Sequence, residues 1–383
     1  MEHSGLPAIV PSRRYRSRIW SAAAIVLLLP LAGAAVMGKP LAAYLQFPPK
    51  TSDVPHAPFS LPWFLALTVL VFATTVPLLR RLISFGRKEG PRKTVLPFPW
   101  WGWAGAALGA AAWILAWARF PWMGGFQAHT FTPLWIAFIL LVNAFTVRRT
   151  GRCLMLSRTR LFLLLFPVSA GFWWSFEYLN RFVGNWRYVG VTEFGALEYF
   201  LFATLPFSTV LPAVLSTREL LLSYPRFDDA FREWRPFSPA RPGAIGLAAL
   251  LLSCAGLFAV GIVPDLAFPL VWVAPPTLLI SLAALRGEPH ALSGIGSGDW
   301  RFPVSSVLAA LLCGFFWEMW NFESYAKWEY DIPYVNVLHV FEMPLLGYAG
   351  YLPFGVLCAE IRDFIVGFVR KDRKTIPVSR RVR

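Results

Sequence analysis

The chain has 383 residues, of which 56% are hydrophobic and 15% are charged. Soluble domains carry roughly 25% charged residues, so the composition argues against a soluble protein and predicts an integral membrane protein. The formal net charge is +15, but its distribution, described below, does not indicate nucleic-acid binding.

Apolar stretches of about 20 residues predict an all-α polytopic membrane protein with about ten transmembrane helices. The predicted helices cover residues 19–38, 60–79, 98–117, 131–147, 159–178, 194–215, 244–263, 266–285, 303–321 and 334–360. They group into an N-terminal two-helix segment (1–95), a first four-helix half (96–216), a cytoplasmic linker (217–243), a second four-helix half (244–361) and a basic tail (362–383).

The N-terminal segment begins with basic residues from Arg13 to Arg18, followed by an apolar run. This order is typical of a signal peptide. Because the run is long enough to cross a bilayer, we predict an uncleaved first helix.

The first half carries polar residues in apolar surroundings, in the order Glu177, Asn180, Trp186, Tyr188 and Glu198. They form the pattern ExxN, then WxY, then E. A charged residue at the centre of a membrane helix costs about 2.5–3.5 kcal/mol on insertion scales. The pattern therefore indicates a polar site inside the bundle.

The linker is polar and rich in proline. Residues 227–234 are compatible with a short amphipathic helix at the cytoplasmic surface, although a solvated linker is the simpler interpretation. The Asp228-Asp229 pair lacks the DDxxD spacing of a diphosphate–magnesium site.

The second half repeats the pattern with Glu318, Asn321, Trp328, Tyr330 and Glu342. Four predicted helices separate the two copies, so both halves have the same orientation, as in parallel transporter repeats. The last predicted helix contains proline and glycine, and we expect it to be kinked or broken.

Two alignments of the halves are open. The ExxN patterns place Glu177 opposite Glu318, whereas matching residues 171–174 to 314–317 places Ser175 there. A shift of two residues turns a helix by about 200°, so the choice decides whether the two carboxyls face the same way.

The distribution of basic residues predicts the orientation. With both termini cytoplasmic, 30 Lys and Arg residues fall in cytoplasmic segments and six on the opposite side. This positive-inside bias predicts a multi-pass protein of the cell (inner) membrane. We expect the basic tail, from Arg370 to Arg383, to anchor this topology or to contact anionic lipid.

No metal site and no cofactor is predicted. The four cysteines lack CxxC spacing, and no HExxH, GxGxxG or Walker pattern is present. His339 lies three residues before Glu342, which suggests a proton-relay partner or a packed histidine.

We expect the four carboxylates to converge on a cavity in the outer leaflet. Glu198 and Glu342 are the stronger catalytic candidates because they lie deeper in their predicted helices. Glu177 and Glu318 lie at helix ends, where pairing with Arg181 or Lys327 is an equally good structural explanation.

The other motif residues have two readings each. Asn180 and Asn321 either bond a carboxylate three residues earlier or cap helix ends. The Trp and Tyr residues either belong to the interfacial aromatic belt or line a site that stabilises a cation by about 2 kcal/mol.

Residues 176–180, 186–188 and 195–202 resemble the membrane-embedded, heterodimer-type lycopene cyclase domain. That family shows an acidic residue at a helix end, a WxY loop and a Pro-x-Glu-Glu motif, in two subunits or two fused domains. The resemblance implies proton-initiated, redox-neutral cyclisation of a polyisoprenoid and matches Glu198 and Glu342 to the acidic motif. Ala196 replaces the proline, and Tyr199 and Met343 replace the second acid.

The leading hypothesis is a membrane enzyme, of cyclase or isomerase type, that acts by acid–base chemistry on an isoprenoid or carotenoid-like lipid. Glu198 and Glu342 would be its proton donor and acceptor, supported by Glu177 and Glu318. The alternatives are a transporter or flippase with a central polar site and a non-catalytic membrane subunit. The sequence does not predict the oligomeric state.

Overall fold

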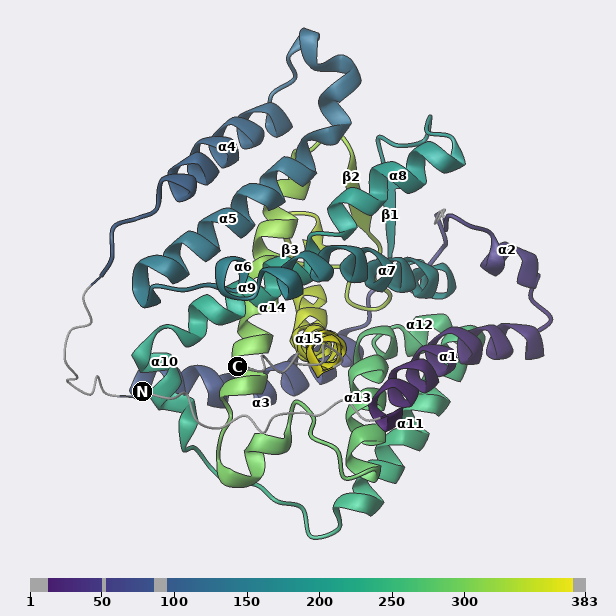
Figure 1. Cartoon of the computed structure of the whole chain (residues 1–383). Coiled ribbons are helices and arrows are strands. Elements are labelled where there is room, and N and C mark those ends of the chain that lie inside the picture. Colours follow the sequence, from purple (N-terminus) through teal and green to yellow (C-terminus); the bar gives the residue numbers. More distant parts are fainter. Residues whose placement is uncertain (1–12, 50–52, 86–94, 375–383) are drawn as a thin grey trace, which may run out of the picture.

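The computed structural model describes residues 13–49, 53–85 and 95–374 and shows a mostly helical chain (Figure 1). The predicted basic tail lies partly outside these residues. The N-terminal half comprises α1 (Arg13–Val36), α2 (Leu41–Leu45), α3 (Leu61–Ser84), α4 (Trp100–Trp117), η1 (Pro121–Thr130), α5 (Phe131–Thr150), α6 (Leu154–Ser157), α7 (Thr159–Val183), β1 (Trp186–Val189), α8 (Ala196–Phe207) and α9 (Val210–Leu222). The remainder comprises α10 (Pro225–Arg232), α11 (Pro242–Ile262), α12 (Pro264–Ala267), α13 (Leu270–Leu285), η2 (Ser293–Ser297), α14 (Arg301–Phe322), β2 (Lys327–Tyr330), β3 (His339–Val340), β4 (Met343–Pro344), η3 (Leu345–Gly350) and α15 (Tyr351–Lys374).

Seven helical segments among the described residues are long and apolar enough to cross a membrane. They are Ser17–Val36, Leu61–Ser84, Pro121–Thr150, Thr159–Val183, Ala196–Leu222, Pro242–Ile262 and Arg301–Phe322. Helix α13 is apolar but shorter. The prediction of a predominantly helical, apolar chain is therefore confirmed at this coarser level.

The N-terminal helix α1 packs closely against α11 in the second half. A Cβ added at Gly33 would lie 2.2 Å from the carbonyl oxygen of Phe258, and one at Gly261 would lie 2.1 Å from that of Pro30. Small residues at a crossing let two helix backbones approach each other, which favours association of apolar helices.

The two WxY segments pair with each other as β1 and β2, an antiparallel ladder that joins the halves (Figure 1). Trp186 lies opposite Tyr330, and Tyr188 lies opposite Trp328. This is the register that a two-fold axis between the central pair, Arg187 and Glu329, generates.

A glycine directs the chain into this ladder. Gly184 ends α7 with φ of 60°, and its N–H donates to the carbonyl of Asn180. Only glycine adopts this left-handed conformation without steric cost. The chain therefore turns sharply at the helix end, and Trp186 folds back over the last turn of α7.

The sixth predicted helix, 194–215, is interrupted. It forms α8 and α9, with a break at Ser208 and Thr209. Pro212 has no N–H to donate to the carbonyl four residues earlier, which accounts for the weak point in the helix.

The tenth predicted helix, 334–360, is wrong over its first 17 residues. This stretch contains the short β3–β4 hairpin and η3, and α15 begins only at Tyr351 and continues to Lys374. Tyr334, Leu338 and Phe341 have positive φ, which is incompatible with a helix, and Pro344 cannot donate a helical hydrogen bond.

The linker does contain a helix, α10, but its apolar face packs against the protein. Phe227 and Phe231 are buried beside Val304, with Leu78 and Leu82 of α3 at the edge of the cluster. The alternative of a fully solvated linker is therefore wrong for these residues.

Candidate functional site

Glu177 is a buried carboxyl on the last turns of α7. Its Oε1 atom accepts hydrogen bonds from Trp173 Nε1 at 3.0 Å, Trp186 Nε1 at 3.1 Å and the Tyr188 hydroxyl at 2.7 Å. Trp173 lies one helical turn earlier, and the other two donors come from β1. Three donors thus converge on one carboxyl oxygen in an apolar interior.

Glu318 is the corresponding buried carboxyl on α14. Its Oε1 accepts from the Tyr330 hydroxyl at 2.9 Å and the Tyr351 hydroxyl at 2.7 Å. Trp328 Nε1 donates to the Tyr330 oxygen at 2.8 Å. The other carboxyl oxygen, Oε2, is buried without a hydrogen-bond partner among the described residues.

The two asparagines hold the strands that carry these donors. Asn180 Nδ2 donates to the Trp186 carbonyl at 2.7 Å, and the Trp186 N–H donates back to Oδ1 at 3.3 Å. Asn321 makes the same pair of bonds with Trp328, at 2.7 and 2.8 Å. The bonds that define the repeat are thus made to a tryptophan backbone, a role that the sequence did not suggest.

These matching contacts decide between the two alignments. Glu177 and Glu318 occupy equivalent positions three residues before the clamping asparagine, and each contacts the tyrosine of its own WxY segment. The ExxN alignment therefore describes the structure, and the alignment that places Ser175 opposite Glu318 does not.

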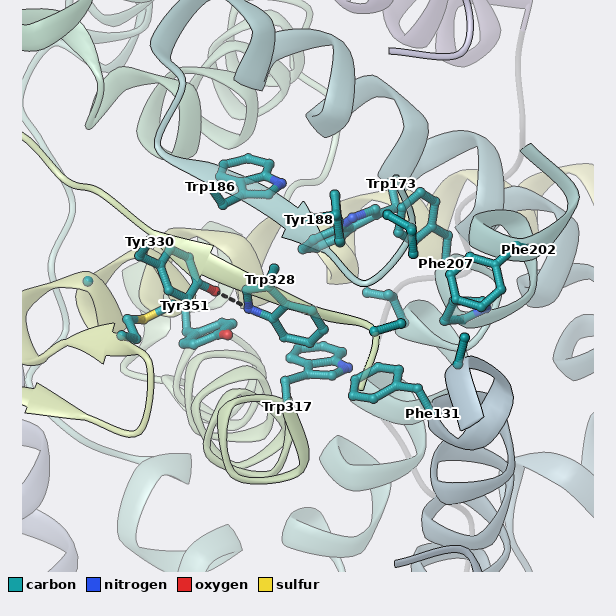
Figure 2. A pocket seen from close by; sticks show the side chains of 18 of the residues that line it. Phe131, Trp173, Trp186, Tyr188, Phe202, Phe207, Trp317, Trp328, Tyr330 and Tyr351 are labelled. Carbon is teal, nitrogen blue, oxygen red and sulfur yellow. Dashed lines mark hydrogen bonds between the residues drawn. The ribbon is translucent and has the colours of Figure 1, made fainter. Parts of the chain in front are cut away.

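A cavity of about 90 Å³ lies between the two carboxyls and is shown in Figure 2. Eleven of its 19 lining residues are aromatic, and none carries a charge. The lining consists of Ala128, Phe131, Trp173, Trp186, Tyr188, Val191, Phe202, Pro206, Phe207, Val210, Trp272, Trp317, Ala326, Trp328, Tyr330, Met343, Gly347, Gly350 and Tyr351.

Both carboxyls lie directly behind the side chains that line the cavity. Neither Glu177 nor Glu318 lines the cavity. Each accepts hydrogen bonds from Trp or Tyr side chains that do line it, so one side chain separates each carboxyl from the cavity. Burial and the neighbouring carboxyl raise the pKa of Tyr188 and of Tyr330, so both phenols remain protonated donors. The site is an aromatic chamber with two buried acidic groups behind its hydroxyls.

Glu198 does not reach this chamber. It is exposed at the start of α8, where its Oε2 accepts the N–H of Gly195 at 3.3 Å. A Glu at the third helical position accepts the backbone N–H of the N-cap residue in this way, and this N–H has no partner within the helix. Glu198 lies in the first turn of α8, at the exposed end of the Ala196–Leu222 span, so it does not reach the cavity on which we expected the four carboxylates to converge.

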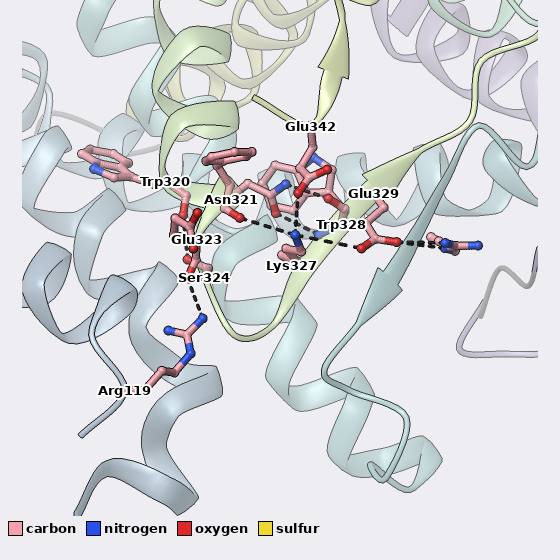
Figure 3. Close-up of polar contacts among 11 residues, drawn as sticks. Arg119, Trp320, Asn321, Glu323, Ser324, Lys327, Trp328, Glu329 and Glu342 are labelled. Carbon is pink, nitrogen blue, oxygen red and sulfur yellow. Dashed lines mark hydrogen bonds and ion pairs between the residues drawn. The ribbon is translucent and has the colours of Figure 1, made fainter. Parts of the chain in front are cut away.

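Glu342 is also outside the chamber. It lies at the turn between β3 and β4, where it forms an ion pair with Lys327 (Figure 3). His339 is exposed in the same hairpin, with its ring 3.1 Å from the Asn336 side chain. The structure therefore places Glu177 and Glu318 behind one cavity, whereas Glu342 and His339 lie in the neighbouring hairpin and do not line it.

Charged residues lie on and beside the β1–β2 ladder. Arg187 pairs with Glu329 at 2.9 Å and also with Asp53. Arg119 donates to the carbonyl of Glu323 at 2.7 Å (Figure 3). These groups are partly exposed, so they stabilise the ladder only modestly.

Sequence reasoning missed two contributors to the site. Trp173 is one turn before Glu177, a spacing that places both on one helix face and could have identified it. Tyr351 reaches Glu318 from the start of α15, and no local pattern connects the two. No cluster of three His, Cys, Asp or Glu residues suitable for a metal occurs among the described residues.

Comparison with known proteins adds no relative to this description: no family model, no curated protein and no solved structure matches the chain. The resemblance to the heterodimer-type lycopene cyclases therefore stays a prediction.

Proposed function

We propose that the chain is a multi-pass enzyme of the cell membrane that holds one end of an unsaturated isoprenoid lipid in the aromatic cavity and isomerises or cyclises it by acid–base chemistry. The observation that carries the proposal is the pairing of an uncharged aromatic chamber with two buried carboxyls directly behind its tyrosines. Aromatic faces stabilise a nearby cation by about 2 kcal/mol each when water is excluded.

Helix α3 supports the membrane setting. None of its 24 residues is buried, although its side chains are strongly apolar. At 1.5 Å per residue it is about 36 Å long, enough to cross a hydrocarbon core of about 30 Å. Its ends are tied by bonds from Ser60 N–H to the Tyr334 carbonyl and from Arg81 to the Ala230 carbonyl. The positive-inside bias of the sequence supports cytoplasmic termini.

The size of the cavity limits what it can hold. A cavity of about 150 Å³ accommodates a benzene ring, so about 90 Å³ has room for one small branched group. The isopropylidene end of an isoprenoid fits this description. The rest of the chain would remain outside the chamber.

A comparison of lipid profiles tests the proposal. Total lipids and pigments are analysed by mass spectrometry in cells without the protein, with the wild type, with Glu177→Gln plus Glu318→Gln, and with Glu198→Gln plus Glu342→Gln. We expect a product of unchanged mass relative to its precursor in the wild type and in the last variant, which alters carboxyls whose partners, Gly195 and Lys327, do not line the cavity. The first double variant should lack it.

Two outcomes would contradict the proposal. Identical profiles with and without the wild-type protein would favour transport, flipping or a non-catalytic membrane role. Loss of product only in the Glu198 and Glu342 variant would place the chemistry outside the aromatic cavity and would favour the residues matched by the family resemblance.

A further inference from the structure

The two buried carboxyls differ in the kind of partner that faces them. Two of the three groups bonded to Glu177 Oε1 are indole N–H groups. The groups bonded to Glu318 Oε1 are both phenol hydroxyls. An indole N–H only donates a hydrogen bond, whereas a hydroxyl both donates and accepts.

The groups that contact Glu177 require its Oε1 atom to accept hydrogen bonds. Trp173 and Trp186 aim N–H groups at the same oxygen, so a proton on that oxygen would oppose them. A carboxylate that accepts two or three N–H or O–H bonds is stabilised in its charged form. The geometry around Glu177 therefore favours the ionised state.

The hydroxyls that contact Glu318 are compatible with a protonated carboxyl that donates a hydrogen bond. Tyr351 and Tyr330 can turn their hydroxyl hydrogens and accept a proton from the carboxyl. Glu318 Oε2 is buried with no partner among the residues described in the structure. An unpaired buried oxygen is far more costly when it carries charge than when it is neutral.

We propose that Glu318 holds a proton and passes it through the Tyr351 hydroxyl to the bound lipid, while Glu177, behind Trp173, Trp186 and Tyr188, is the carboxylate whose charge stabilises the resulting cation. This assignment rests on the proposed function of the cavity. Tyr351 is the delivering residue because it lines the cavity and its hydroxyl lies 2.7 Å from Glu318 Oε1. Tyr330 is less suited, because its oxygen already accepts the Trp328 N–H (Figure 2).

The step balances without a redox partner. The Glu318 proton moves to the Tyr351 oxygen as the Tyr351 proton moves to the CH carbon of the terminal alkene, and the alkene electron pair forms the new C–H bond. The tertiary cation left at the dimethyl-substituted carbon is attacked by a second C=C bond of the same lipid, which closes a ring and moves the positive charge to the far carbon of that bond. Loss of a proton from a neighbouring carbon to the Tyr351 oxygen, with return of its proton to Glu318, restores the site.

Infrared spectroscopy tests the assignment without a substrate. The purified full chain in bilayers is compared with Glu318→Gln and with Glu177→Gln. We expect the wild type minus Glu318→Gln spectrum to contain the C=O band of a protonated carboxyl, and the wild type minus Glu177→Gln spectrum to contain only carboxylate bands. The reverse pattern, or the same band type in both, would overturn the proposal.

A conservative variant provides a second test if Glu318→Gln does not fold. Tyr351→Phe removes one hydroxyl from Glu318, so the protonated-carboxyl band should shift in frequency and not disappear. An unchanged band would show that the hydroxyl does not contact a protonated Glu318.

Turnover in deuterium oxide separates this inference from the proposed function. We expect the wild-type product to gain deuterium from solvent and Tyr351→Phe to lower kcat by about 10²–10⁴-fold, the usual effect of losing a general acid, with KM little changed. Wild-type turnover in Tyr351→Phe would overturn the role of Tyr351 alone. Absence of any wild-type product would overturn the proposed function and leave the infrared result standing.

Discussion

The two copies of the ExxN–WxY unit share a backbone frame but surround their carboxyls differently. In both, an asparagine clamps the tryptophan backbone, and a tyrosine two residues later bonds the glutamate. In the first copy both tryptophans that contact the site donate directly to Glu177. In the second copy the strand tryptophan donates to the Tyr330 oxygen, and the hydrogen bonds to Glu318 Oε1 come from two hydroxyls.

One position explains much of this difference. Four residues before the glutamate stands Trp173 in the first copy and Gly314 in the second. The space that a side chain at Gly314 would fill is taken by Tyr351, whose ring atom Cε2 lies 2.3 Å from a Cβ built there. The small residue at position 314 thus leaves room beside the carboxyl for the Tyr351 phenol, where the first copy has the Trp173 indole. Related halves can divide the work of a site in this way while keeping one frame.

Substitution of the two clamping asparagines should give the largest loss in the free energy of unfolding and so tests the backbone arrangement that the two copies share. Asn321→Leu leaves the N–H and the C=O of Trp328 unpaired, at about 1–3 kcal/mol for each buried group, so we expect a loss of about 2–6 kcal/mol in the free energy of unfolding. Asn180→Leu should lose a similar amount through Trp186. Unfolding in mixed micelles titrated with a denaturing detergent measures both.

A surface asparagine provides the control for these variants. Asn336 is half-buried and contacts the exposed side chains of Asp331 and His339, so Asn336→Leu should change the free energy of unfolding by about 0.5 kcal/mol or less. If a clamp variant changed the free energy of unfolding as little as this control, the stability of the two halves would not depend on the bonds between the asparagines and the tryptophan backbones.

Gly314 tests the difference between the copies. Gly314→Ala places a methyl group against the Tyr351 ring, and overpacking of this kind costs about 1–3 kcal/mol. Gly171→Ala is the matched control, since a Cβ there meets nothing within 4 Å and alanine favours the helix by about 0.5–1 kcal/mol. Thermal unfolding of the two variants should therefore shift in opposite directions.

A tolerated Gly314→Ala would contradict this account of the second copy. It would mean that Tyr351 moves away from α14 at little cost, and the hydroxyl contact to Glu318 would then not be fixed by packing.

The sequence predicts the helices better than it predicts the site. Long apolar runs place most helices correctly because burial or lipid exposure favours helix over any open backbone. The run from residue 334 to 350 is apolar as well, yet it folds as a hairpin and a 3₁₀ turn. Its proline and glycines indicated a break but not its extent.

Glu198 and Glu342 lie outside the cavity for separate reasons. The spacing from Gly195 to Glu198 is that of a capping box, which signals a helix start and an exposed carboxylate. Glu342 lies in the β3–β4 turn, within a stretch where the predicted helix 334–360 does not form. No local pattern predicts the contact between Tyr351 and Glu318, because it depends on how α15 packs into the space that Gly314 leaves on α14.

The smallest expected effect concerns the ion pair at the centre of the ladder. Arg187 and Glu329 face each other where the two copies meet, but 41% of the Arg187 side chain is exposed. Exposed pairs contribute about 0.2–1 kcal/mol. A double-mutant cycle with Arg187→Ala and Glu329→Ala should give a coupling energy in this range that falls as salt is added.

A larger or salt-independent coupling would contradict the view that backbone pairing and the asparagine clamps hold the halves together. Lys327 and Glu342, a pair within the second half, provide the comparison. Their side chains are less exposed than Arg187, so their coupling should equal or exceed that of the central pair. If the central pair proved the stronger, charge and not the repeated frame would join the two copies.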